Sequence, residues 1–209
     1  TSAPEVVDTV NPIVTGISSN FANIEGDDVV SDSDFEVTYT VGFSEPIPGM
    51  GGEDIIVDGG SLVPGSVVVD EGGMGATFLV EASNDSMDAL SVTVLGTVTD
   101  IHGNFLAETA TSAPEVVDTV NPTITTFEQS FGDDVDDGIL ADAEQPIIYN
   151  VSFSEPVQSF TKSDINTAGN GTVQSDITID TDLYGEIRGA SFSVVARDNF
   201  EGELIVNIE

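Results

Sequence analysis

A twelve-residue segment occurs twice in the chain, and its spacing limits the folds that the sequence can form. The segment TSAPEVVDTVNP occupies residues 1–12 and again residues 111–122, which is 110 positions later. The register holds for about fifty residues and resumes, after a four-residue insertion in the second copy, with Leu90 aligned to Leu204. A period near 110 is far too long for a solenoid unit and is the size of one small sandwich domain. The sequence therefore predicts two related domains in tandem.

Apolar residues recur at every second position within each copy, which is the period of a β-strand rather than of a helix. Phe35–Phe43 has an apolar residue at each odd position, and Ile147–Phe153 repeats the pattern. Asn170-Gly171 is a strong hairpin signal because both residues tolerate positive φ. The predicted strands of the first copy lie near 13–18, 35–44, 54–59, 65–70, 76–83 and 89–95, with a last one within 105–117. We expect an all-β fold of tandem immunoglobulin-like antiparallel β-sandwich domains.

The repeat also predicts the domain boundaries. Residues 1–12 are the end strand or linker of a preceding repeat, 13–117 the first domain, 118–122 a linker, and 123–209 the second domain. Because Glu209 aligns with Leu95, the second domain is expected to lack its last strand. Either the chain is an excerpt from a longer tandem array, or Thr1–Val10 completes the open domain of a neighbouring molecule by β-strand addition.

The charge balance excludes several classes of function. The chain has 38 Asp and Glu against three Lys and Arg, a net charge of −35, and no Cys or Trp. Three cations cannot neutralise a row of phosphates, so nucleic acid and anionic membranes are excluded as partners. No apolar run approaches the length of a membrane-spanning helix. No nucleophile elbow or Gly-rich loop before a helix is present, so we expect neither an enzyme nor a small-molecule substrate.

Self-repulsion of this size opposes the compact state, so a folded chain needs bound divalent cations or high salt. Bound cations predict carboxylates gathered at loops, whereas halophilic adaptation predicts carboxylates on every exposed face. A junction rich in carboxylates suits Ca²⁺, which takes six to eight oxygen ligands in loose geometry. Zn²⁺ and copper prefer His or Cys, and the chain has a single His. Ca²⁺ is therefore the expected cofactor.

The loops that chain direction brings to the junction of the two domains carry most candidate ligands. The first domain contributes the loops that precede residues 35 and 89, and the second domain contributes the loops that precede residues 164 and 187. The linker lies between the two domains. The candidates from the first domain and the linker are Asp27, Asp28, Asp32, Asp34, Asp85, Asp88, Asp118 and Asn121. Those from the second domain are Glu155, Asp164, Asp180 and Asp182. The alternative interpretation is a solvated acidic rim.

A second candidate site lies at the opposite end of the first domain, in the segment Asp100-Ile101-His102-Gly103-Asn104. One hypothesis is a calcium site in which Asp100 and Asn104 join residues from neighbouring loops, namely Asp8, Asn11, Glu45 and Asp54. The other is a tight turn that closes through its own hydrogen bonds from side chain to backbone. His102 is a lone histidine in a loop and is not expected to bind metal.

The ordered motifs resemble a known family. Phe-Ser-Glu-Pro is followed by Asp-Ile in both copies (43–55 and 153–165), and Asp-x-x-Gly-Asn follows at 100–104. This order is similar to the bacterial Ig-like tandem repeats of large RTX-type surface adhesins. The resemblance implies an Ig-like sandwich in a long secreted array, whose repeats are extenders stiffened by calcium. The positions that match the family pattern are Glu45, Asp54, Glu155, Asp164, Asp100 and Asn104.

The expected function is that of a structural extender or spacer module in a bacterial extracellular adhesin or surface filament, with neighbouring Ig-like repeats as partners. One alternative is a self-polymerising filament subunit that uses its N-terminal segment as a donor strand. The other is a calcium-dependent module that binds carbohydrate or protein. The expected location is extracellular, at the cell surface.

Overall fold

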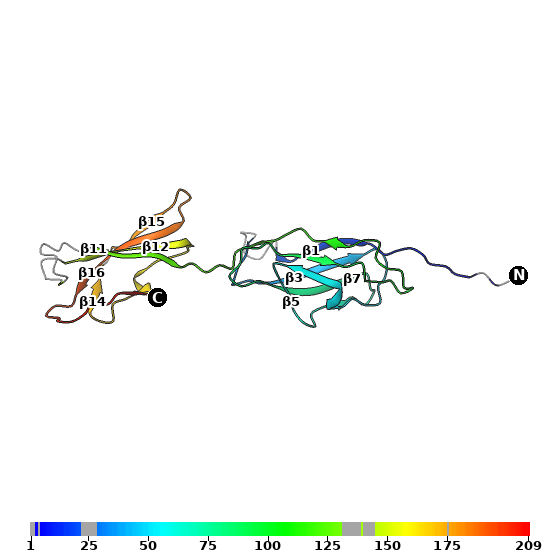
Figure 1. The fold of residues 1–209 in the computed structure, drawn as a ribbon, viewed down its shortest axis with the longest axis horizontal. Helices are drawn as coiled ribbons and strands as arrows, with labels where there is room; N and C mark the ends of the chain where they lie inside the picture. The colour runs from blue at the N-terminus through cyan, green and yellow to red at the C-terminus, as the bar shows by residue number, and fades with distance from the viewer. Residues whose placement is uncertain (1–2, 4, 22–28, 131–138, 140–144, 175) are drawn as a thin grey trace. The chain divides into compact units, whose positions relative to one another are not determined.

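The computed structural model describes residues 3, 5–21, 29–130, 139, 145–174 and 176–209 (Figure 1). The chain divides into two compact units, Thr1–Asn121 and Pro122–Glu209. Both units are built from strands, with helical structure limited among the described residues to short 3₁₀ turns such as η2 (Gly52–Asp54) and η4 (Lys162–Asp164). None of the helical segments in the described part of the chain is long and apolar enough to cross a membrane.

The larger sheet of the first unit is antiparallel and places the strands in the order β1-β3-β7-β5, with β6 also paired to β7 (Figure 1). The bounds of these strands are β1 Val14–Ser19, β3 Glu36–Phe43, β5 Gly60–Leu62, β6 Val68–Val69 and β7 Gly75–Ala82. Tyr39 on β3 lies opposite Phe78 on β7, and their rings stack with centroids 5.9 Å apart.

The second sheet of this unit contains β4 (Ile55–Asp58), β8 (Ser91–Val94) and β9 (Ala110–Thr111) in the order β4-β8-β9. A short parallel pair joins β2 (Val29–Val30) to β10 (Val116–Val117). Both β5 and β6 pair with β7, so they are counted together as strand D, and the other strands of the two sheets are lettered in chain order. The sheets then read A-B-E-D and C-F-G, which is the strand order of a constant-type immunoglobulin sandwich. The all-β sandwich that the sequence predicts is therefore confirmed.

The alternating pattern explains which side chains form the first core. On β3, Val37, Tyr39 and Val41 are fully buried, while the residues between them face outward or are half-buried. The facing sheet contributes Leu90, Val92 and Val94, which are also fully buried. The pattern is wrong at its first position, because Phe35 precedes β3 and is 43% exposed. Its carbonyl still accepts from Ala82 N, so only the side chain leaves the core at this end of the sheet.

The larger sheet of the second unit repeats the arrangement with the order β11-β12-β16-β14, and β15 also pairs with β16. The bounds are β11 Ile124–Ser130, β12 Ile147–Val157, β14 Gly171–Val173, β15 Thr178–Thr181 and β16 Ile187–Ala196. The rings of Tyr149 and Phe192 stack at 5.4 Å, and Phe127 stacks on Tyr149 at 5.6 Å. Tyr149 and Phe192 are the counterparts of Tyr39 and Phe78 in the first unit.

The second sheet of this unit consists, among the described residues, of β13 (Ile165–Asn166) paired with β17 (Asn207–Ile208). No described strand takes the place that β9 has in the first unit. Leu204, Val206 and Ile208 are consequently only half-buried, whereas their counterparts Leu90 and Val92 are fully buried.

The hairpin predicted at Asn170-Gly171 is wrong, because the flanking strands β13 and β14 lie in different sheets, β13 paired with β17 and β14 with β16. A tight turn just before Asn170 connects the two sheets instead. Ala168 and Gly169 hold the positive φ values, 51° and 76°, and Asn170 N donates to Thr167 O. Gly171 is already the first residue of β14. Two consecutive positive-φ residues inside a four-residue turn define type I′ geometry, which glycine adopts easily and which carries a backbone cost at Ala168.

Candidate metal centre

The loop Asp100–Asn104 follows β8 and folds into a closed turn. Asp100 N donates to Asn104 O at 3.0 Å, and Gly103 N donates to Asp100 O at 3.2 Å. Gly103 has a φ of 89°, in the left-handed region that favours glycine. The turn that the sequence predicts is therefore present, and its backbone holds the Asp100 side chain against the unit.

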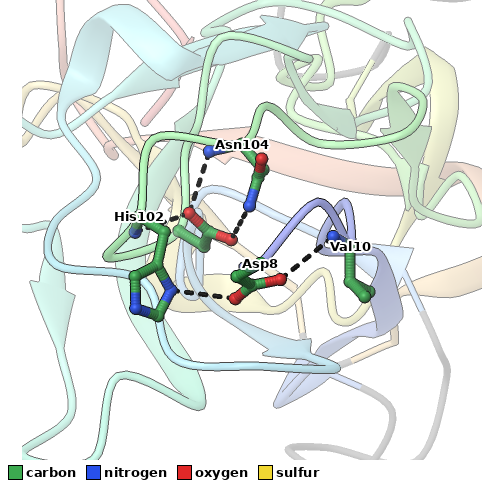
Figure 2. A network of polar contacts seen from close by, with 5 residues as sticks. Asp8, Val10, His102 and Asn104 are labelled. Carbon is green, nitrogen blue, oxygen red and sulfur yellow. Dashed lines mark hydrogen bonds and ion pairs between the residues drawn. The ribbon is translucent and has the colours of Figure 1, made fainter. Parts of the chain in front are cut away.

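The Asp100 carboxylate receives three hydrogen bonds from its own loop. Oδ1 accepts from His102 N at 2.7 Å and from Asn104 N at 2.9 Å, and Oδ2 accepts from Asn104 Nδ2 at 2.8 Å (Figure 2). The residue is only 2% exposed. Burial acts to raise the pKa of Asp100, but the bonds from Asn104 and His102 outweigh it, so the pKa lies below its ordinary value. The carboxylate is thus held in its charged form.

Asp8 reaches this loop from the segment before β1. His102 Nδ1 lies 2.9 Å from Asp8 Oδ2, and Asp8 Oδ1 accepts from Val10 N at 3.0 Å (Figure 2). One ligand atom from each of Asp8, Asp100 and His102 falls within 4.8 Å of the others. This is a geometry in which three side chains can share one ion. The sequence pairs Asp8 with Asp100 and Asn104; in the structure Asp8 and Asp100 lie together with His102, and Asn104 donates to Asp100.

Sequence reasoning leaves His102 out of the site, and the structure places it inside. The residue stands two positions after Asp100, where the turn aims its imidazole at Asp8. The spacing Asp-x-His within a turn could have indicated this. The sequence pairs Asp8 with this loop, but it could not show that the imidazole of His102 would face Asp8.

The other residues predicted for this end of the first unit have different surroundings. Asp54 caps η2: its Oδ2 accepts from Gly51 N at 2.9 Å, and its Oδ1 accepts from Thr97 Oγ1 at 2.7 Å. In the part of the chain that the structure describes, neither Asp54 nor Glu45 is in a group of three carboxylate or histidine side chains with Asp8 or Asp100, and Asn11 is exposed. The structure thus assembles part of the predicted site and leaves Asp54 in a capping role.

The junction candidates of the first unit fall partly on residues whose placement is not described. Asp27 and Asp28 lie outside the described residues. Asp34 Oδ1 accepts from Ser31 N at 2.9 Å, and Asp85 Oδ2 accepts from Asn84 Nδ2 at 2.9 Å. Asp118 Oδ1 accepts from Val120 N at 3.3 Å. Asp32, Asp88 and Asn121 are described, but within the described residues the structure brings neither Asp32 nor Asp88 into a carboxylate or histidine group of three.

The candidates of the second unit show two kinds of environment. Asp164 caps η4, with its Oδ2 accepting from Thr161 N at 2.7 Å, just as Asp54 caps η2. Asp182 Oδ1 accepts from Tyr184 N and Glu186 N; these bonds and the neighbouring Arg188 hold the pKa of Asp182 below its ordinary value. Glu155 differs, because its Oε1 is buried and has no hydrogen-bond partner among the residues that the structure describes. A buried carboxylate oxygen of this kind is an available ligand. The convergence of Asp118, Glu155 and Asp164 on one ion stays a prediction.

The donor set at Asp8 and Asp100 suits a divalent cation in two ways. Ca²⁺ would use the carboxylates of Asp8 and Asp100 together with backbone or water oxygens, because it prefers oxygen ligands. A carboxylate offers about four lone-pair positions, so the three N–H bonds to Asp100 leave room for an ion. The imidazole of His102 is instead a ligand for Zn²⁺ and similar ions. The residues present fit either ion, and His102 distinguishes the two cases.

A scan against models of protein families finds no match for the chain, and a search of the curated proteins finds no similar protein.

Proposed function

We propose that the chain is a structural spacer module of a bacterial extracellular adhesin or surface filament, stiffened by Ca²⁺. Two sandwich units in tandem supply length, and the carboxylates at their loops supply oxygen ligands. Neighbouring repeats of the same kind are the proposed partners. The work of such a module is mechanical: it holds its ends apart and resists bending where one unit follows another.

The observation that carries this proposal is the contact between the segment before β1 and the loop after β8. Asp8 meets His102 at 2.9 Å, and Pro12 O accepts from Ala107 N at 2.9 Å. Ser44 N also donates to Ile13 O at 3.0 Å. Residues 1–12 have the same sequence as residues 111–122, which connect the two units. A connecting segment of this sequence can therefore be fixed to the unit that follows it.

An ion between Asp8 and Asp100 would strengthen this attachment and reduce the repulsion between the two carboxylates. Extracellular modules bind Ca²⁺ with a Kd of about 10⁻⁴–10⁻³ M. At about 100 times the Kd, one site adds roughly 2.7 kcal/mol to the free energy of unfolding. That is a large share of the net stability of a domain.

The test is thermal unfolding in Ca²⁺, in Mg²⁺, in EGTA, and in EGTA with molar NaCl. We expect Ca²⁺ at millimolar concentration to raise the midpoint well above the other three conditions. Asp100→Asn should remove most of that rise, while Asp58→Asn, at an exposed position on β4, should keep it. Equal rescue by NaCl and Ca²⁺ would mean that the carboxylates need only screening, and the calcium part of the proposal would fail.

A further inference from the structure

We propose that the tip of the hairpin between β15 and β16 docks onto a protein partner that offers an apolar pocket bordered by basic side chains. The hairpin tip is residues 182–186, which connect the two strands. This inference goes beyond the spacer function and does not depend on calcium. It rests on a comparison of the same hairpin in the two units.

The four-residue insertion of the second copy lies entirely within this hairpin. In the first unit Val69 on β6 pairs with Ala76 on β7, and six residues connect them. In the second unit Ile179 on β15 pairs with Ala190 on β16, and ten residues connect them. The paired positions on either side are equivalent in the two copies, so the added residues lengthen the hairpin alone. In Figure 1 the orange loop that follows β15 projects away from the other strands of the second unit.

The hairpin tip has a well-defined backbone that Asp182 organises. Asp182 N donates to Glu186 O at 2.9 Å, and Gly185 N donates to Asp182 O at 3.1 Å. The Asp182 side chain adds to this, because its Oδ1 accepts from Tyr184 N at 2.8 Å and from Glu186 N at 3.1 Å. Gly185 has a φ of 85°, which glycine adopts without strain. A tip that is already held in one conformation loses little conformational entropy when it binds.

This ordered tip presents two apolar side chains to the solvent. Leu183 is 100% exposed and Tyr184 is 89% exposed, and neither belongs to the core of the second unit. The corresponding turn of the first unit, which closes on Asp70, has Glu71 and Gly72 after its aspartate. Apolar side chains that are fully exposed gain no free energy from folding. A rigid aromatic residue beside an aliphatic one is instead typical of the anchors of protein interfaces.

The charges beside the apolar pair indicate the chemistry of the partner. The ten connecting residues contain three carboxylates, Asp180, Asp182 and Glu186, and one cation, Arg188. Arg188 already has partners within the hairpin, because its Nε lies 3.4 Å from Asp182 Oδ2 and its Nη2 lies 3.8 Å from Glu186 Oε2. Asp180 and Glu186 are exposed. The complementary surface therefore has basic side chains around a pocket for Leu183 and Tyr184.

Three other occupants fit the hairpin tip less well. Sites for sugars and other small molecules are concave, whereas this tip projects. A membrane with anionic lipids repels the carboxylates beside the apolar pair. A second copy of the chain carries the same net charge of −35 and repels the tip in the same way.

Selection of random peptides displayed on phage tests the chemistry of the partner. The full chain is the immobilised target, and the selection is made in about 0.15 M NaCl, which screens charges more than about 8 Å apart. We expect the enriched peptides to combine an aromatic or aliphatic cluster with Lys or Arg. Their binding should weaken as the salt concentration rises.

A double variant shows whether these peptides bind the hairpin tip. We expect Leu183→Ser with Tyr184→Ser to weaken their binding at least about tenfold, because the anchors of the contact are removed. Met74→Ser is the matched control, since Met74 is 44% exposed in the corresponding turn of the first unit, and it should leave binding unchanged. The double variant should also keep the midpoint of thermal unfolding, because both side chains are exposed in the free chain.

A second double variant separates the charges from the apolar pair. Asp180→Asn with Glu186→Gln should weaken binding of the same peptides by about two- to fivefold, which is the size expected for exposed ion pairs. It should also reduce the dependence of binding on salt.

Several results would overturn the proposal. Failure to enrich any peptide, or equal binding to the parent chain and the Leu183→Ser, Tyr184→Ser variant, would show that the tip is not a docking element. Equal loss with Met74→Ser would show that the peptides recognise exposed apolar residues in general. Peptides without basic residues would remove the basic border of the pocket. Binding of the parent chain, but not of the double variant, to phosphatidylcholine vesicles or to neutral oligosaccharides would assign the tip to a different partner, and loss of self-association in that variant would assign it to a second copy.

Discussion

His102 Nδ1 lies 2.9 Å from Asp8 Oδ2, so the segment before β1 and the loop after β8 meet at one point of the first unit. The two side chains are 55% and 25% exposed, and an exposed pair of this kind contributes at most about 1 kcal/mol. The position of this contact beside a further carboxylate is more important than its own energy. Asp100 is adjacent, and its carboxylate is already held in the charged form by its own loop.

His102→Gln separates the two ions that fit this place. We expect the variant to keep the stabilisation by Ca²⁺, because Ca²⁺ takes oxygen ligands, and to lose any stabilisation by Zn²⁺, which uses imidazole. Thermal unfolding with each ion measures both effects. Loss of the Ca²⁺ effect in this variant would show that the imidazole itself is needed.

Asp100→Asn is expected to lower the free energy of unfolding most at neutral pH and least in acid. The folded pKa of Asp100 lies below the ordinary value of 3.8, so the unfolded chain binds the proton more readily. The stabilisation is therefore complete above the unfolded pKa and is lost as the pH falls through the folded pKa. Urea unfolding between about pH 6 and about pH 3 should show the variant and the parent chain converging. With Asp58→Asn as the exposed control, a constant difference across this range would contradict the prediction.

Leu90→Ala and Leu204→Ala compare the two units at equivalent positions. Leu90 is fully buried, and its truncation should cost about 2–5 kcal/mol. Leu204 is half-buried, and its truncation should cost less than half as much, because less apolar surface leaves the core. Hydrogen exchange resolved by residue reports each unit separately. Equal costs would mean that the second core is as well covered as the first.

Gly73→Ala should destabilise the first unit more than Gly65→Ala. Both glycines have positive φ, 66° and 76°, so each substitution carries a backbone cost of about 1 kcal/mol. A Cβ at Gly73 would lie 2.5 Å from Ile47 O, whereas a Cβ at Gly65 would meet nothing within 4 Å. The difference between the two unfolding free energies isolates the steric part. Similar values would show that the chain around Ile47 moves at little cost.

Tyr39 should ionise at unusually high pH. Burial raises its pKa to about 12, and the negative charge of Glu115 contributes in the same direction. Since the folded pKa is raised, the stability of the unit should fall as the pH rises from about 10 to about 12. Tyrosinate absorbance during alkaline titration measures the ionisation, and Tyr39→Phe should remove the component near 12. A parent chain that titrates fully near pH 10 would disprove the burial of this hydroxyl.

The strands and the two-unit organisation follow from the sequence because both depend on local or repeated information. The alternation of apolar and polar residues over Val37–Val41 predicts a strand with one buried face, whatever surrounds it. The 110-residue repeat predicts the same buried face at Tyr149 and Val151. Phe35 and the turn at Ala168-Gly169 escape prediction, because strand ends and turn positions are set by neighbouring strands.

The candidate site depends on tertiary structure to a greater degree. The carboxylates of Asp8 and Asp100, far apart in sequence, can be paired by counting which loops share one end of a sandwich. Counting loops does not show where a side chain points. The orientation of the His102 imidazole and the capping role of Asp54 are therefore known only from the folded backbone. The same holds for Leu204: its sequence reads as core, and only the sheet decides whether a strand covers it. Periodicity and repetition act along the chain, whereas contacts between distant residues exist only after the sheets have packed.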